Sequence, residues 1–170
     1  ESGGFGQAML FNKTLADQYG QSIFTLGEEY KNLYATSTSA GMSLSSTNAI
    51  YKSLIVSGAE LKLSNESISL SMRAITQMID KQNISSEELK GQLAEHIPGA
   101  YGLMAKAAKD AGISVTGSTQ ELAKLLEQGK LASNVVLPYF AKRMEEAFGK
   151  NANENVKTIS GSANRMTNEL

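Results

Sequence analysis

Apolar residues recur along most of the chain at intervals of three and four positions, with polar residues between them. The clearest example is the stripe formed by Ile68, Met72, Ile75 and Ile79. Because an α-helix has about 3.6 residues per turn, this spacing places the four side chains on one helical face that a partner must cover. Two further stripes have the same spacing: Leu103, Met104, Ala107, Ala108 and Ala111, and then Val136, Phe140, Met144 and Phe148.

The strict alternation typical of half-buried strands is nearly missing, so the pattern predicts an all-α fold. Short connections between the helices favour a compact bundle of about eight short-to-medium helices. The expected helices are 6–17, 19–39, 46–57, 65–81, 86–95, 98–111, 119–128 and 134–148.

Helix-start signals agree with these stripes. Ser64 is placed to cap a helix, with Leu63 before it and Ile68 at the fourth helical position, which is the spacing of a hydrophobic staple. Ser85 and Glu88 have the spacing of a capping box, in which the carboxylate reaches back to the amide of the capping residue. Both signals predict helices that begin just after a serine.

Further signals mark the second half of the chain. Ser118 and Glu121 repeat the capping-box spacing. Pro98 suits the first turn of a helix, where its missing N–H would have had no partner. Gly112 follows the Ala-rich stripe, where a left-handed residue commonly ends a helix.

Changes in composition along the chain suggest three segments. Residues 1–18 are expected to form a partly helical N-terminal lead-in, and residues 19–149 a folded helical domain. Residues 150–170 are richer in Asn, and we expect them to be loosely attached here and to lead into a longer helical region. Their apolar residues form a narrow stripe at helical spacing: Val156, Ile159, Ala163 and Met166. Because the chain begins with Glu1, we expect a fragment of a longer protein.

Composition narrows the possible chemistry. The chain has 170 residues, no Cys and one His, which excludes thiol catalysis, a disulfide framework and structural zinc. Its 16 basic and 17 acidic side chains give a net charge of −1, without the excess of cations typical of proteins that bind DNA or RNA. No run approaches the roughly 18 consecutive apolar residues of a membrane span. We therefore expect no specific nucleic acid, no cofactor and no membrane span.

Local motifs do not form a catalytic constellation. Gly4 and Gly6 resemble the start of a dinucleotide loop, but Met9 replaces the third glycine, so we interpret them as a flexible chain end. His96 follows Glu95, and adjacent residues on a helix point about 100° apart, so we expect a surface or helix-end histidine. We expect no enzyme, with no catalytic, cofactor-binding or metal-binding residue and no small-molecule substrate.

A helix-turn-helix remains an alternative for the stretch 103–126. Ala108 and Gly112 have the spacing of its first helix and turn, but the second helix would bury Ser118 and Glu121 and present no basic face. The tyrosines lie among apolar neighbours and are expected in or at the edge of the core, not as stacking platforms for bases. They are Tyr30, Tyr34, Tyr101 and Tyr139.

One pair of motifs resembles a known family. Residues 74–78 read Ala-Ile-Thr-Gln-Met, and residues 84–100 contain Glu-Glu-Leu-Lys-Gly-Gln-Leu followed by Pro-Gly-Ala. These motifs resemble the tape measure domain of the tail tape measure proteins of long-tailed bacteriophages and prophages. The resemblance is strong over 74–148 and looser over 15–71. Supporting positions are Gly41 to Leu44, Ala107 and Ala108, Gly112 to Ser114, Leu122, Leu125 and Leu126, Gly129 and Lys130, and Leu137 and Pro138.

The resemblance implies a structural virion protein whose long helical body fixes tail length while tube subunits polymerise around it. Residues 19–149 would then be the tape measure domain. The implied partners are other phage tail proteins, namely the tail tube, the tail tip and assembly chaperones, with self-association possible. The implied location is the virion tail, and the host cytoplasm during assembly. The competing interpretation is a helical adaptor or DNA-binding module unrelated to phage.

The signature residues also have a physical interpretation. Leu89 and Leu93 are four positions apart and are expected to pack inward. Glu88 is expected to cap the helix, and Gly91 to let another helix or chain segment approach closely. These are roles in the fold, which is why the signature adds no candidate site residue.

Overall fold

The computed structural model describes residues 2–19 and 23–150 and the single positions 164, 166 and 168. Within these residues the fold is all-α, as predicted, and its one β-bridge joins Asn83 to Ala132. Its elements are α1 (Ser2–Tyr19), α2 (Ile23–Ser39), α3 (Leu44–Glu60), α4 (Asn65–Asp80), α5 (Ser86–Glu88), the π-helical turn η1 (Leu89–Leu93), α6 (Ala94–His96), α7 (Ala100–Asp110), α8 (Thr119–Glu127) and α9 (Ser133–Phe148).

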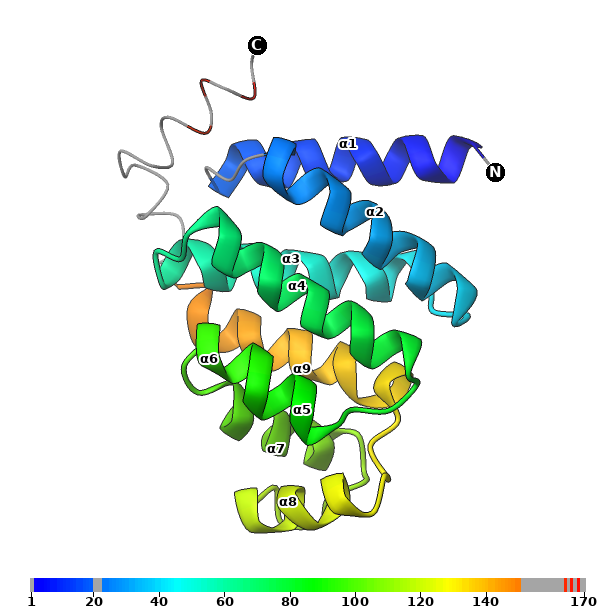
Figure 1. Ribbon diagram of the computed structural model, residues 1–170, viewed down its shortest axis with the longest axis vertical. Coiled ribbons are helices and arrows are strands. Elements are labelled where there is room, and N and C mark those ends of the chain that lie inside the picture. The colour runs from blue at the N-terminus through cyan, green and yellow to red at the C-terminus, as the bar shows by residue number, and fades with distance from the viewer. Residues whose placement is uncertain (1, 20–22, 151–163, 165, 167, 169–170) are drawn as a thin grey trace.

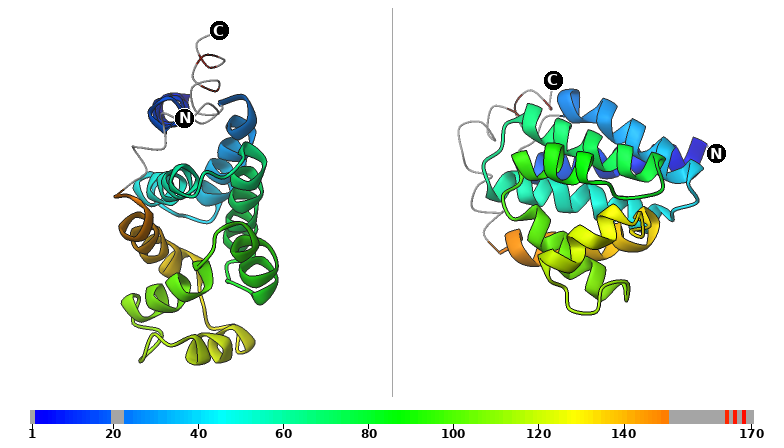
Figure 2. Two further views of the ribbon diagram at one scale, coloured as in Figure 1. Left: turned by 90° about the vertical axis from the view of Figure 1, so that its left-hand side faces the viewer. Right: turned by 60° about the horizontal axis from the view of Figure 1, so that its bottom comes forward.

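The helices form a bundle of two layers, with one further helix across each end. α2 packs along α4 in one layer, and α3 packs along α9 in the other (Figure 1; Figure 2, left). α1 crosses one end of the bundle on α2 and α3, and α8 closes the other end on α7. The short α7 lies beside α9, so the exposed sides of these two helices share one face of the molecule.

The predicted stripes meet in one core. Ile68, Met72, Ile75 and Ile79 are all at most 1% exposed. The inner faces of the two later stripes are buried in the same cluster, while Leu103, Ala111 and Phe148 lie half-buried at its edge. Pairing of amphipathic faces therefore builds the bundle, as the spacing predicted.

The predicted capping serines behave in different ways. Ser64 accepts a hydrogen bond from the Ser67 amide at 3.1 Å, which confirms the cap of α4. The capping box at Ser85 was wrong: its hydroxyl makes no bond to a helical amide and donates to the Glu88 carboxylate instead. Lys81 also binds that carboxylate from outside the helix. A buried carboxylate with two side-chain donors has no need of the Ser85 amide.

Two other details of the same region differ from expectation. α7 begins at Ala100, so Pro98 lies in the turn before the helix and not in its first turn. The reason is Gly99, whose φ of +84° is left-handed and cannot belong to a right-handed helix. The helix expected at 86–95 contains the π-turn η1, in which the Ala94 amide donates to the Leu89 carbonyl five residues earlier.

Three glycines, Gly91, Gly4 and Gly6, do not have the roles expected of them. Gly91 is exposed, and a Cβ added there would meet nothing within 4 Å, so the expected close approach is absent. The close approach occurs at buried Gly58 of α3, where an added Cβ would lie 2.5 Å from Ile68 Cδ1 of α4. Gly4 and Gly6 lie inside α1, so the flexible chain end expected there was also wrong.

The C-terminal prediction falls mostly outside the described residues, since Val156, Ile159 and Ala163 are not among them. Of that stripe, Met166 is described and is 71% exposed. The Asn65 side-chain amide donates to Asn164 at 3.2 Å, and the Asn168 side-chain amide donates to the Asp17 carboxylate of α1 at 3.3 Å. These described positions therefore contact the helices at the α1 end of the bundle.

Candidate interaction surface

The polar chemistry of the described residues is dispersed. None of their His, Asp and Glu side chains gather in threes in a geometry that could hold a metal ion. No described helix is long and apolar enough to cross a membrane. His96 ends α6 and is half-buried, while Glu95 beside it is exposed. His96 thus lies at a helix end, as expected.

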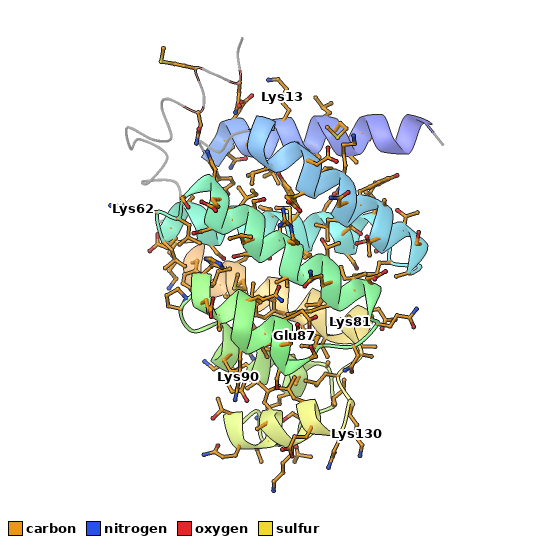
Figure 3. The ribbon with its side chains drawn as sticks, viewed as in Figure 1. Lys13, Lys62, Lys81, Glu87, Lys90 and Lys130 are labelled. Carbon is orange, nitrogen blue, oxygen red and sulfur yellow. The ribbon has the colours of Figure 1, made fainter. Side chains whose placement is uncertain are left out.

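Four lysines from different parts of the chain do not share one face. Lys13 of α1, Lys62 after α3, Lys90 of η1 and Lys130 after α8 point to different sides of the molecule (Figure 3). Lys90 lies 4.8 Å from the centre of the Tyr101 ring, a cation–π contact within the fold. A protein that follows a nucleic-acid backbone concentrates cations along one face or groove, and these four lysines do not.

The helix-turn-helix alternative meets a geometric obstacle. Eight residues, 111–118, connect α7 to α8, whereas that motif joins its helices with a turn of about three or four. Ser118 caps α8 by accepting from the Glu121 amide at 3.1 Å, as its position predicted. The Glu121 carboxylate, however, turns back to the connection and not to the Ser118 amide.

Glu121 holds the connection between α7 and α8. Its carboxylate accepts from the Val115 amide at 2.9 Å and from the Thr116 amide at 2.8 Å. The hydroxyls of Ser114 and Thr116 donate to it at 2.8 and 2.7 Å. These hydrogen bonds lower the pKa of Glu121 to about 2, and the bond from the Val115 amide has the largest effect. The first turn of α8 therefore carries a fixed negative charge, which phosphate would avoid.

A second carboxylate lies under the surface beside η1. The Glu88 side chain is 1% exposed and receives hydrogen bonds from Lys81 and Ser85. Burial raises the pKa of the Glu88 carboxyl, but the bonds from Lys81, Ser85 and its own backbone amide outweigh burial and hold the pKa below its usual value. Glu87 next to it is 75% exposed and lies 3.8 Å from Lys81 (Figure 3). The role of Glu88 is to tie α4 to η1.

A third carboxylate joins the two long helices of one layer. The Glu29 side chain of α2 is 8% exposed and receives a hydrogen bond from Arg73 of α4 at 2.6 Å and another from Ser69 at 3.1 Å. Beyond this contact the two helices leave a polar hollow of about 360 Å³, lined in part by Asn32, Gln77 and Asp80. Side chains far apart in sequence thus fix how α2 lies on α4.

Another hollow lies between α7 and α9. It measures about 430 Å³ and is lined by Asp110, Tyr139, Lys142, Arg143 and Glu146. Arg143 donates to both oxygens of Asp110, at 2.7 and 2.8 Å, and this pairing lowers the pKa of Asp110. The prediction for Tyr139 was wrong, since this side chain is 42% exposed. Its neighbours Val136 and Phe140 fill the inner face of α9, which turns Tyr139 outward.

Sequence reasoning missed this face because its parts are distant in the chain. Asp110 and Arg143 are 33 residues apart, and no local spacing connects them. The one local signal was that Val135 and Tyr139 are four residues apart and out of phase with the buried stripe of α9. Both are large apolar residues that remain more than two-fifths exposed.

These features define a class: an all-helical module whose buried carboxylates, Glu29 and Glu88, are paired within the fold. A family model described as tape measure protein matches residues 1–170. The chain is also 32% identical over 165 residues to a probable tape measure protein of Salmonella phage Felix O1 (isolate Felix O1-VT1), which covers 94% of the chain and 21% of that protein. No solved structure matches.

The chain belongs to the tape measure protein family, a class of phage tail components. It spans about a fifth of the length of the curated relative that it matches. The all-helical fold and the signature at 84–100 agree with the resemblance stated from sequence.

Proposed function

We propose that this chain is a folded module of a phage tail tape measure protein, which acts in tail assembly and tail-length determination through protein–protein contacts. The observation that carries the proposal is the family match over the whole chain. The described polar clusters support it as well, because Glu29, Glu88 and Glu121 are all occupied by contacts within the fold.

The module would not itself set the length of the tail. A continuous α-helix adds about 1.5 Å per residue, so 170 residues in one helix would extend for about 255 Å. The longest described helix is α1, whose 18 residues correspond to about 27 Å, and the next helices fold back on one another. Length would then be set by helical sequence elsewhere in the full-length protein, while residues 19–149 form a docking domain.

The proposed partners are tail proteins: tube subunits, tail-tip proteins and assembly chaperones, with self-association as a further contact. The proposed location is the virion tail, and the host cytoplasm while tails assemble. Residues 150–170 would lead from the domain into a longer helical region. In this proposal the module has no catalytic step, and its surface residues act by binding.

Deletions in the full-length protein, followed by electron microscopy of the tails, test this division of labour. Removing about 60 residues of continuous helical sequence outside the module should shorten tails by about 90 Å. Removing 19–149 should instead abolish or misdirect tail assembly. It should not simply shorten the tails by about 200 Å, which is the length that these residues would have as one continuous helix. Normal assembly with tails shortened by about 1.5 Å per residue removed from 19–149 would refute the docking role.

A further inference from the structure

Three hollows between α2 and α4 join into one groove. The hollow of about 360 Å³ shares Thr36 and Asp80 with a hollow of about 90 Å³. The smaller hollow in turn shares Ala40, Ile79 and Gln82 with one of about 230 Å³ that reaches the start of α9. α2 and α4 run side by side in the same direction (Figure 1), so the groove follows the seam between their C-terminal halves.

The walls of this groove carry polar side chains without partners. Four side-chain amides line it: Asn32, Gln77, Gln82 and Asn134. None of these amides makes a hydrogen bond to another described residue. A side-chain amide offers both a donor and an acceptor, which are the two kinds of group that a peptide backbone presents. The groove therefore has free capacity for hydrogen bonds to a main chain.

The charge of the groove comes from one carboxylate. Among the described residues that line the three hollows, Asp80 is the one that is charged. Asp80 is exposed and makes no salt bridge within the described part of the chain. Two other carboxylates that contact α4 or the turn after it are already paired, Glu29 with Arg73 and Glu88 with Lys81. An unpaired carboxylate among uncharged walls is complementary to one positive charge.

The dimensions and the chemistry suit an extended segment better than a helix. Asn32 and Ala40 are eight positions apart on the α2 wall, which corresponds to about 12 Å, or to about three to four residues of an extended chain. An extended backbone can offer its N–H and C=O groups to the amides, whereas a helix has already paired them. The small side chains of Ala35, Ala40 and Ala132 leave room for a backbone to approach.

Gln82 places its amide in the groove from a strained backbone position. Its φ of +59° is left-handed, the conformation that Gly112 adopts after α7 and Gly129 after α8. Glycine adopts this conformation without steric cost, so the Gln82 side chain is not required by the turn. The Gln82 carbonyl also accepts from the Ser133 amide of α9 at 3.4 Å, which helps to fix this end of the groove.

We propose that this α2–α4 groove binds an extended peptide segment that carries a lysine or an arginine. The cationic side chain would pair with Asp80, where two of the hollows meet, and the side-chain amides would hydrogen-bond to the main chain of the segment. Main-chain bonds would supply affinity, and the charge would fix the register of the segment. The inference rests on the proposed function for the source of the segment, which is another tail protein, and on the groove for its chemistry.

Photo-crosslinking in the full-length protein during phage assembly tests the proposal. A short diazirine amino acid replaces Ala35, which is exposed and lines the groove, and the crosslinked peptides are identified by mass spectrometry. The matched control carries the same probe at Gln120, an exposed residue of α8 outside the groove. We expect a tail-protein peptide with Lys or Arg near the crosslink, captured from position 35 and not from position 120. No capture, a peptide without Lys or Arg, or a second copy of this chain would each overturn the proposal.

A short synthetic peptide tests whether the segment binds in an extended form. Eight residues of the captured sequence are too few for a stable helix in isolation. Added in excess to extracts of infected cells, this peptide should reduce the crosslink by about tenfold, and the same peptide with its Lys or Arg replaced by Glu should not compete. Competition by a peptide of about 20 residues but not by the peptide of eight would indicate a bound helix and overturn the proposal.

Substitutions in the groove then test its residues. Asp80→Lys should reduce the crosslink by about tenfold or more, and a Lys→Glu or Arg→Glu change in the captured peptide should restore it. Gln82→Gly should reduce the crosslink several-fold and leave the circular dichroism spectrum unchanged, because glycine adopts the same φ without strain. Lys62→Gly is the matched control, since Lys62 has a φ of +55° after α3, and it should leave the yield within about twofold. A crosslink that Asp80→Lys and Gln82→Gly leave unchanged would overturn the proposal.

Failure of this inference is distinguishable from failure of the proposed function. If the groove is not the docking site, position 35 captures no basic tail-protein peptide, while deletion of 19–149 still disrupts tail assembly. If the proposed function is wrong, the deletion leaves assembly intact whatever position 35 captures.

Discussion

Gly58→Ala probes the closest approach between two helices of the bundle. The new methyl group would lie 2.5 Å from Ile68 Cδ1 and 2.7 Å from Ile68 Cγ1. Ile68 is 1% exposed and belongs to the core, so it has little room to move away. Overpacking of this kind costs about 1–3 kcal/mol. Alanine also gains about 1 kcal/mol over glycine as a helix former. The expected net result is a loss of about 0–2 kcal/mol in the free energy of unfolding.

A double-mutant cycle tests whether the cost of Gly58→Ala comes from contact with Ile68. Ile68→Ala alone should cost about 2–5 kcal/mol, because it removes buried atoms and leaves a cavity. In that background the added methyl of Gly58→Ala meets only the Ile68 Cβ position at 4.0 Å, so the substitution should become stabilising by about 1 kcal/mol. The coupling of the two positions should therefore be about 1–3 kcal/mol.

Urea unfolding followed by circular dichroism measures each corner of the cycle. Gly102→Ala in α7 is the matched control, since a Cβ there meets nothing within 4 Å, and it should be neutral or stabilising by up to about 1 kcal/mol. The reasoning fails if Gly58→Ala has the same effect in both backgrounds, because the cost would then not come from Ile68. It fails equally if the single variant is more stable than the parent protein.

Two further substitutions check other parts of the fold. Leu89→Ala should cost about 2–5 kcal/mol in urea unfolding, because Leu89 is 0% exposed, and a change below about 0.5 kcal/mol would place it on the wrong face. The Glu121 pKa is lowered from 4.5 to about 2, so its contribution to stability is complete above pH 4.5 and is lost as the pH falls through about 2. Hydrogen exchange of the Val115 and Thr116 amides measures this effect: in the parent protein their protection should fall over that pH range, and in Glu121→Gln it should no longer depend on pH there. The same pH profile in both proteins would refute the assignment.

Local sequence signals were reliable where one helix decides the outcome. Ser64 and Ser118 cap their helices because a serine hydroxyl reaches the amide three residues later without help from the rest of the fold. The buried stripes were predictable for the same reason, since helical spacing fixes which side chains share a face. Gly112 has a φ of +79°, as expected of a residue that ends a helix.

The missed features depend on contacts between distant segments. Ser85 has the same spacing to Glu88 as Ser118 has to Glu121, yet neither carboxylate reaches the amide of its serine. Glu88 binds Lys81 instead, and Glu121 binds the Val115 and Thr116 amides. Nothing in the spacing of Gly58 reveals that Ile68 of the next helix lies against it. The exposure of Tyr139 follows from how α9 is rotated on α3 and α7, which only the packed bundle determines.

Lys81→Met is the prediction that follows from the buried carboxylate. In the parent protein the pKa of Glu88 is held below its usual value, so the group stabilises the fold above that value and the contribution is lost as the pH falls. Without Lys81 the carboxylate would lose a hydrogen bond and a nearby positive charge while its burial remained, so the pKa of Glu88 would be higher than in the parent protein.

The cost of the substitution should therefore depend on pH. The variant should be less stable than the parent at pH 7, where the Glu88 carboxylate is ionised in the parent, and the difference should shrink as the pH falls and the carboxylate is protonated. Glu87→Gln is the control, because Glu87 is 75% exposed and lies 3.8 Å from Lys81, and it should change stability by less than about 0.5 kcal/mol. Urea unfolding at several pH values measures both variants. A loss for Lys81→Met that is the same at pH 4 and pH 7 would show that the lysine stabilises the fold through its aliphatic stem and not through the Glu88 carboxylate.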